Sequence, residues 1–154
     1  LAPLRSVINY CRHYRDRYGV MDIVYGSRSM QDLVDYREIV DEWTADTDVH
    51  VHLTIDREQP EWQGHVGFVP NYVGELGFTT DKVAIICGPP IMIKFTLAGL
   101  EKLGFNKTQI YTTMELRMKC GIGKCGRCNI GSKYVCKDGP VFRMDALEEL
   151  PNEY

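Results

Sequence analysis

Four cysteines lie close together near the end of this 154-residue chain, and their surroundings restrict what the segment can fold into. Residues 119–136 read KCGIGKCGRCNIGSKYVC, so the cysteines are separated by four, two and seven residues. The same loop holds four glycines, which leave the backbone free to wrap closely around a group held by sulfur. The cysteines are Cys120, Cys125, Cys128 and Cys136.

Three kinds of site put four cysteines so close together: a disulfide knot, a zinc site and an iron–sulfur cluster. A structural zinc site usually combines two separated C-x-x-C pairs, whereas this loop has one. The first three cysteines match the C-x4-C-x2-C spacing of plant-type [2Fe–2S] ferredoxins, whose fourth cysteine comes later. The spacing therefore predicts a [2Fe–2S] cluster on these four thiolates, with zinc as the alternative. Backbone N–H groups and nearby cations are expected to tune its potential; the cations are Lys119, Lys124, Arg127 and Lys133.

Composition excludes several classes of protein. The chain is 44% hydrophobic and 25% charged, with a net charge of −3 and no basic stripe, which argues against nucleic acid as the main partner. No apolar run approaches the roughly 20 residues of a membrane span, and no signal peptide is visible. We therefore expect a cytoplasmic protein with no membrane span. In that reducing compartment disulfides are rare and grouped thiols usually hold metal.

Helical and strand patterns alternate before the cysteine loop. Helices are expected at 3–19, 31–43, 71–76 and 91–103, with Gly19 and Gly104 closing the first and last. Strands are expected at 20–25, 49–55, 83–87 and 110–114, and the run at 83–87 is apolar enough to be buried on both faces. The alternation predicts an α/β fold: a Rossmann-like parallel sheet with helices on both faces, followed by a small C-terminal loop module.

Several motifs resemble the ferredoxin–NADP reductase superfamily. LAPLR at 1–5 is similar to the end of its G-G-x-G-x-A-P-x-R segment, and CGPPIM at 87–92 resembles its C-G-P-x-x-M motif. ELRMKCGIG at 115–123 and VCKDGPVF at 135–142 resemble a narrower branch. That branch contains the dihydroorotate dehydrogenase electron-transfer subunit and the gamma subunits of cytoplasmic sulfhydrogenases. Related subunits serve anaerobic sulfite reductase and heterodisulfide reductase complexes.

The resemblance implies a domain order for the chain. Residues 1–115 are expected to form an NAD(P)-binding domain, 116–142 a [2Fe–2S] module and 143–154 a tail. In this branch an FAD-binding barrel precedes the nucleotide domain, and the sheet begins with a strand that has no counterpart here. The resemblance therefore implies an N-terminally truncated part of a longer flavoprotein, poorly stable by itself.

Nucleotide contacts are expected where helices begin and strands end. The first helix begins at Ala2 and Pro3, and its free N–H groups suit a dinucleotide pyrophosphate, as those of any helix would. Ser27 and Arg28 follow the strand at 20–25, where ligands bind in open α/β sheets, although Arg28 fits an unoccupied surface arginine equally well. Asp56 ends the strand at 49–55 and can accept from a ribose 2′-OH. This favours NADH over NADPH, although Arg57 beside it acts in the opposite direction.

The resemblance also gives roles to the CGPPIM motif. Cys87 is expected near the nicotinamide and the flavin, as the catalytic position, with Gly88, Pro89 and Met92 in the cofactor site. A small buried core residue explains Cys87 equally well. Cys11 is expected in the core. The four histidines lack metal-ligand spacing and are interpreted as surface or turn residues: His13, His50, His52 and His65.

The combined hypothesis is an NAD(P)H-dependent flavin and iron–sulfur oxidoreductase subunit of the diaphorase type. Electrons would pass between NAD(H), FAD in the full-length protein, the [2Fe–2S] cluster and another subunit of a redox complex, in either direction. Hydrogenase, dihydroorotate dehydrogenase, sulfite reductase and heterodisulfide reductase are the candidate partners. The rival hypotheses are a zinc-stapled interaction module without redox function and a free ferredoxin-like carrier.

Overall fold

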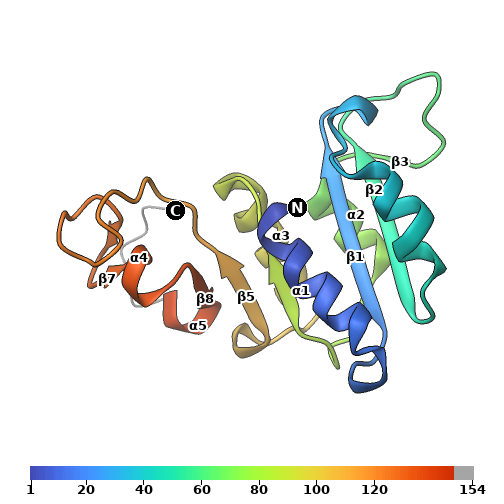
Figure 1. The fold of residues 1–154 in the computed structure, drawn as a ribbon. Coiled ribbons are helices and arrows are strands. Elements are labelled where there is room, and N and C mark those ends of the chain that lie inside the picture. Colours follow the sequence, from blue (N-terminus) through green and yellow to red (C-terminus); the bar gives the residue numbers. More distant parts are fainter. Residues whose placement is uncertain (148–154) are drawn as a thin grey trace. The chain divides into compact units, whose positions relative to one another are not determined.

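The chain forms two compact units, Leu1–Gly77 and Phe78–Tyr154, in a computed structural model that describes residues 1–147. Each unit has its own sheet (Figure 1). The first unit contains α1 (Ala2–His13), β1 (Met21–Ser27), β2 (Val49–Ile55), β3 (His65–Val66) and α2 (Val69–Leu76). The second contains β4 (Ala84–Ile86), α3 (Pro90–Lys102), β5 (Ile110–Thr113), β6 (Asn129–Ile130), β7 (Lys133–Tyr134), α4 (Val135–Asp138), β8 (Val141–Arg143) and α5 (Met144–Leu147).

The first unit is a parallel sheet in the order β1-β2-β3. β1 and β2 pair along their whole length, from Met21 opposite Val49 to Ser27 opposite Ile55. The alternation of apolar and polar residues at 49–55 predicted β2 to the residue, because side chains of a strand point alternately to its two faces. β3 adds two residues beside the end of β2.

Helices cover both faces of this sheet, as predicted. On one face α1 and the helical segment Glu38–Glu42 close a core made by Ile8, Ile23, Ile39, Trp43 and Val49. On the other face α2 lies so close to β1 that a Cβ on Gly26 would sit 2.4 Å from Cγ2 of Val69. A parallel sheet with two covered faces is the arrangement that alternating helices and strands produce.

Two helix boundaries differ from the prediction. α1 ends at His13 and not at Gly19, because the Arg15 guanidinium donates to the carbonyls of Tyr18 and Gly19 and fixes a separate turn there. The helix predicted at 31–43 is broken. Asp35 has a φ of 58°, which is incompatible with a continuing α-helix, and the chain then forms the π-helical turn Glu38–Glu42.

The second unit combines parallel and antiparallel pairs. β4 and β5 are parallel, and β8 pairs antiparallel with β5, Phe142 lying opposite Thr112. The predicted helix and strands lie within a few residues of α3, β4 and β5, whereas β8 was not predicted. The expected burial of residues 83–87 on both faces is wrong in this structure: Val83 is 63% exposed and Ile85 is 40% exposed. Within residues 1–147, β4 pairs with β5 alone, so one edge of the strand carries no neighbour.

The cysteine loop leaves the sheet after β5 and returns to it through β8. Met114 N–H donates to Pro140 O at 2.9 Å, which closes the base of the loop. A small core of Cys128, Ile130, Val135 and Phe142 lies inside the module. Residues 143–147 of the predicted tail end β8 and form α5; the rest of that tail lies outside the described residues. Across residues 1–147 we find no helix with the length and apolarity of a membrane span.

Candidate functional site

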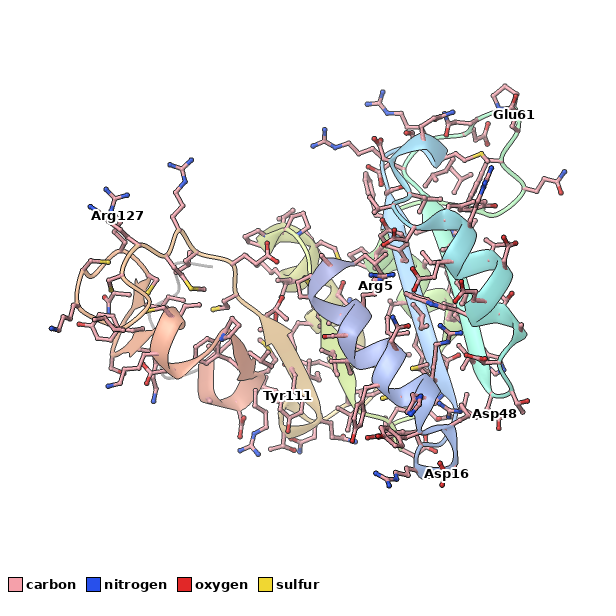
Figure 2. The ribbon with its side chains drawn as sticks, in the orientation of Figure 1. Arg5, Asp16, Asp48, Glu61, Tyr111 and Arg127 are labelled. Atoms are coloured by element: carbon pink, nitrogen blue, oxygen red, sulfur yellow. The ribbon has the colours of Figure 1, made fainter. Side chains whose placement is uncertain are left out.

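The four cysteines of the loop differ in exposure. Cys128 is buried in the module core, Cys120 and Cys136 are half-buried, and Cys125 is exposed. Figure 2 shows the loop with its sulfur atoms in yellow and with Arg127 projecting from it. The loop therefore has an inner side, at Cys128, and an outer side, at Cys125.

Backbone N–H groups are directed at the sulfur atoms. Gly123 donates to Sγ of Cys136 at 3.3 Å, Lys124 and Cys125 donate to Sγ of Cys120 at 3.3 and 3.4 Å, and Cys136 donates to Sγ of Cys128 at 3.5 Å. Gly123 has a φ of 72°, in the left-handed region that favours glycine, so its turn depends on the residue type. Such N–H groups stabilise negative charge on thiolate sulfur.

The thiols form two pairs. Cys120 and Cys125 lie within hydrogen-bonding reach of each other, and so do Cys128 and Cys136. Within residues 1–147, no three His, Cys, Asp or Glu side chains converge on a position suited to one metal ion. A structural zinc gathers four ligands on one ion, whereas a [2Fe–2S] cluster places two protein ligands on each iron. The two pairs of thiols match the two protein ligands that each iron of a binuclear cluster takes.

The two pairs also differ in acidity. Backbone hydrogen bonds from Ile122, Cys125 and Lys124 lower the pKa of Cys120 to about 6. The neighbouring Cys128 thiol and burial raise the pKa of Cys136 above its ordinary value. Metal ligands must be thiolates, and the Cys120 thiol of the outer pair ionises more readily than the Cys136 thiol of the inner pair.

Three of the predicted nucleotide residues lie at one end of the first sheet: Ser27, Arg28 and Asp56. Asp56 N–H donates to Ser27 O at 3.1 Å, and the Ser27 hydroxyl donates to Ser29 O at 2.6 Å. Arg28 is exposed and forms no ion pair with an acid in the described part of the chain. The paired carboxyl ends of β1 and β2 thus carry the Ser27 hydroxyl and the Arg28 guanidinium on one strand and the Asp56 carboxylate on the other.

Ala2 and Pro3 form the first turn of α1, which carries no side-chain cap. Arg5, one turn further on, pairs with Glu38 through an Nη2–Oε2 contact of 2.6 Å (Figure 2). That ion pair ties α1 to the π-helical turn. The free N–H groups at the start of the helix remain available to an anion, as predicted for any helix beginning with Ala-Pro.

The CGPPIM residues form the turn between β4 and α3 in the second unit. Cys87 is half-buried, and Pro89 precedes the first residue of the helix. A Cβ added to Gly88 would lie 2.2 Å from Cε of Met92, so the Met92 side chain lies directly against the glycine. A larger residue at position 88 would displace the flexible end of the Met92 side chain. Cys11 is half-buried on α1, where burial raises the pKa of its thiol.

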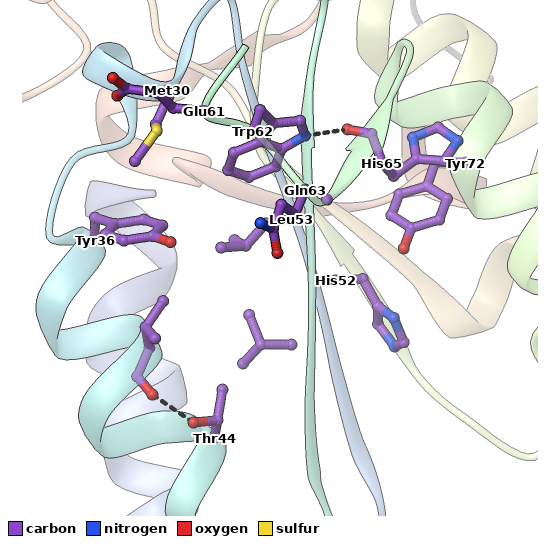
Figure 3. Close-up of a pocket in the computed structure, with 13 residues that line it drawn as sticks. Met30, Tyr36, Thr44, His52, Leu53, Glu61, Trp62, Gln63, His65 and Tyr72 are labelled. Carbon is purple, nitrogen blue, oxygen red and sulfur yellow. Dashed lines mark hydrogen bonds between the residues drawn. The ribbon is translucent and has the colours of Figure 1, made fainter. Parts of the chain in front are cut away.

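A cavity of about 400 Å³ in the first unit was not predicted (Figure 3). Its lining includes Tyr36, Trp62 and His65, and the Trp62 indole donates to His65 O at 2.8 Å. Of the four histidines interpreted as surface or turn residues, His13 and His50 are exposed, whereas His52 and His65 are half-buried beside Tyr72. Strand alternation placed His52 on the polar face, but the sequence does not show that α2 covers that face.

The fold and the loop together define a nucleotide-binding oxidoreductase domain joined to an iron–sulfur module. Residues 1–98 match the oxidoreductase NAD-binding domain, and residues 115–148 match the iron–sulfur cluster binding domain of dihydroorotate dehydrogenase B. The chain belongs to the oxidoreductase NAD-binding domain family and carries that iron–sulfur domain at its C-terminal end.

Individual relatives agree with both matches. Sulfhydrogenase 1 subunit gamma of Pyrococcus furiosus is 38% identical over 97% of this chain and 53% of its own length. The dihydroorotate dehydrogenase B (NAD(+)) electron transfer subunit of Clostridium perfringens is 35% identical over 79% of this chain and 45% of its own length. The chain thus spans about half the length of the curated relatives it matches.

Solved structures show the same fold. The structure of NADH-dependent reduced ferredoxin-NADP oxidoreductase, described for flavin-based electron bifurcation, superposes with a TM-score of 0.64 and 25% identity. The superposition covers 94% of this chain and 49% of that chain. The Rossmann-like, ferredoxin reductase-like α/β fold predicted from the sequence is confirmed.

Proposed function

We propose that this chain is the electron-transfer part of an oxidoreductase complex, passing electrons between NAD(H), FAD and a [2Fe–2S] cluster to a partner subunit. One observation carries the proposal: a loop with two pairs of thiols and converging N–H groups is joined in one chain to an NAD-binding domain. The four thiolates of Cys120, Cys125, Cys128 and Cys136 would hold the cluster. When bound, such a cluster supplies one-electron transfer.

The side chains around the nucleotide have binding roles. The first turn of α1, which contains Ala2 and Pro3, would offer its free backbone N–H groups to the pyrophosphate, although Pro3 itself has none. Ser27 and Arg28 would bind the adenosine part, and Asp56 would accept from a ribose hydroxyl. At the β4–α3 turn, Cys87, Gly88, Pro89 and Met92 would border the nicotinamide. A carboxylate at position 56 repels a 2′-phosphate, so NADH is the expected substrate and NADPH is disfavoured.

A flavin is required because a nicotinamide transfers two electrons as hydride and the cluster takes one at a time. We propose that FAD is held by a domain outside these residues, with 1–115 as a truncated NAD(P)-binding domain, 116–142 as the cluster module and 143–154 as the tail. The unpaired edges of two strands support a continuation of the sheet outside these residues. In the described residues β1 pairs with β2 alone and β4 with β5 alone, so each offers an edge to a further strand.

The partner subunit is proposed from the relatives and from the resemblance. Hydrogenase and dihydroorotate dehydrogenase complexes are supported by the names of the relatives; sulfite reductase and heterodisulfide reductase rest on motif resemblance. We place the protein in the cytoplasm, where thiols stay reduced. Electron transfer from NAD(P)H through a flavin is often called diaphorase activity. In the proposed complex, the partner would set the direction in which electrons run.

The test uses the full-length protein that contains this chain, purified without oxygen. NADH should bleach the visible absorption of the cluster, and dithionite should bleach it to the same final level. A zinc-stapled module would be colourless. A free carrier would be coloured and would respond to dithionite but not to NADH, and that result would contradict the proposal.

A further inference from the structure

The cluster module has a charge opposite to that of the whole chain. Residues 115–143 contain seven lysines and arginines and two acidic residues, although the chain as a whole has a net charge of −3. All seven cations are exposed, and we call the six other than Arg143 the basic rim: Arg117, Lys119, Lys124, Arg127, Lys133 and Lys137.

The cations of the basic rim are not neutralised by neighbouring acids. Within residues 1–147, none of the six forms an ion pair, whereas the seventh cation of the module, Arg143, is paired with Asp145 at 2.7 Å. Unpaired cations of one sign on one module produce a field that attracts acidic surfaces and speeds their encounter.

An apolar residue lies within the same loop. Ile122, between Cys120 and Cys125, is 61% exposed, and Met118 just before the loop is 45% exposed. Cys125 is itself exposed, so the outer thiol pair lies at the same surface as Ile122. An exposed apolar residue surrounded in sequence by cations has the composition of a small interface: an apolar centre and a charged rim.

We propose that the outer side of the cluster loop docks an electron-carrier protein or subunit whose contact surface is acidic around a small apolar centre. Ile122 fills that centre, the basic rim pairs with the acids, and Cys125 faces the partner. Cys128 is closed off by the module core, which leaves the side at the exposed Cys125 for electron exchange. This proposal rests on the proposed electron-transfer function and specifies its partner.

A purely local role for the cations is the competing explanation. Positive side chains near a bound cluster raise its reduction potential without any partner. The two explanations predict different results for the same variants. Docking predicts a change in binding affinity and in its salt dependence. Local tuning predicts a change in the reduction potential of the cluster alone.

The experiment measures binding with the full-length protein that holds its cluster, as shown by its visible spectrum. The probes are a small acidic ferredoxin and a basic c-type cytochrome, and the dissociation constant is measured by calorimetry at low and high ionic strength. We expect the acidic probe to bind, its affinity to fall several-fold between about 50 and 200 mM salt, and the basic probe not to bind. The double variant Lys124→Glu/Arg127→Glu should weaken binding at least tenfold.

Two further variants separate the contributions. Ile122→Ser should weaken binding roughly three- to tenfold without changing the salt dependence, because it removes an apolar contact and no charge. Lys102→Glu on α3 reverses an exposed cation outside the module and should leave the affinity within about twofold. Visible spectra and midpoint potentials of all variants report whether the cluster site is intact.

Three results would overturn the proposal. They are no binding of the acidic probe, preferential binding of the basic probe, or a shifted potential with unchanged affinity in Lys124→Glu/Arg127→Glu. These results leave the proposed function untouched, because the bleaching of the cluster by NADH is measured without any probe.

Discussion

At the scale of single residues, Glu38 joins three elements of the first unit. Its carboxylate accepts from the Arg5 guanidinium of α1 and, at 3.3 Å, from the indole N–H of the buried Trp43. The hydrogen bond from Arg5 is the main reason that the pKa of Glu38 lies below its ordinary value of 4.5. Because the folded pKa is lowered, the ionised form stabilises the fold above the unfolded pKa, and this stability is lost as pH falls.

Replacing Glu38→Gln should therefore lower the urea midpoint at pH 7 and have a smaller effect at an acidic pH, because protonation of the native carboxylate also removes its charge. Urea unfolding at the two pH values checks this. Glu42→Gln is the matched control, because Glu42 is 63% exposed and approaches Arg12 only at 3.9 Å. An equal fall in the urea midpoint for both variants would contradict the role assigned to Glu38. So would a fall in the midpoint of Glu38→Gln that does not depend on pH.

Asp56 is the residue on which nucleotide preference is predicted to depend. Asp56→Asn removes the charge that repels a 2′-phosphate and keeps the size of the side chain, so the ratio of kcat/KM for NADPH to that for NADH should rise about tenfold. Steady-state kinetics of the full-length protein measure the ratio. Glu58→Gln, two residues away and exposed, should not change it. A preference that stays constant in Asp56→Asn would remove Asp56 from the site.

At the scale of secondary-structure elements, the contact between β1 and α2 depends on one glycine. A Cβ on Gly26 would lie 2.4 Å from Val69 and 3.0 Å from Thr54, so the helix and the two strands would have to separate. Gly74, within α2, has no atom within 4 Å of such a Cβ. Replacing glycine by alanine is therefore expected to change stability in opposite directions at these two positions.

Gly26→Ala should destabilise the first unit by about 1–3 kcal/mol, because added volume in a packed contact forces side chains or backbone to shift. Gly74→Ala should stabilise it by about 0.5–1 kcal/mol, because alanine is the better helix residue and restricts the unfolded chain. Denaturant unfolding gives both values. Destabilisation by both substitutions would show that α2 does not pack on β1 as described.

The elements that the sequence predicts well are those with a strong local pattern. Residues 49–55 alternate because one face of β2 is apolar, and the glycine after 91–103 marks the end of α3 closely. The break at Asp35 depends on a backbone conformation that aspartate adopts only in context. β8 is three residues long and is stabilised by β5, about 30 residues earlier, so its own sequence carries little information.

The candidate site also combines features that the sequence predicts with features that depend on the fold. Cysteine spacing predicts the ligands, because four thiols separated by four, two and seven residues suit few sites. It does not predict their division into an outer and an inner pair, which depends on how Ile130, Val135 and Phe142 bury Cys128. The half-burial of His52 and His65 was missed because it depends on Tyr72, in a helix that follows them in the chain.

At the scale of the whole molecule, one chain joins a domain that binds a two-electron carrier to a loop suited to a one-electron cluster. The NAD-binding match covers residues 1–98, and the iron–sulfur match covers residues 115–148. Between them lies β5, which pairs with β8 at the base of the loop. In the proposed function, the loop on this sheet would pass electrons from the nucleotide chemistry to a partner protein.

Metal analysis of the anaerobically purified full-length protein tests this account most directly. We predict about two irons and two acid-labile sulfides per chain, a brown colour that dithionite bleaches, and loss of iron in Cys128→Ser. One zinc per chain with neither iron nor sulfide would contradict the account.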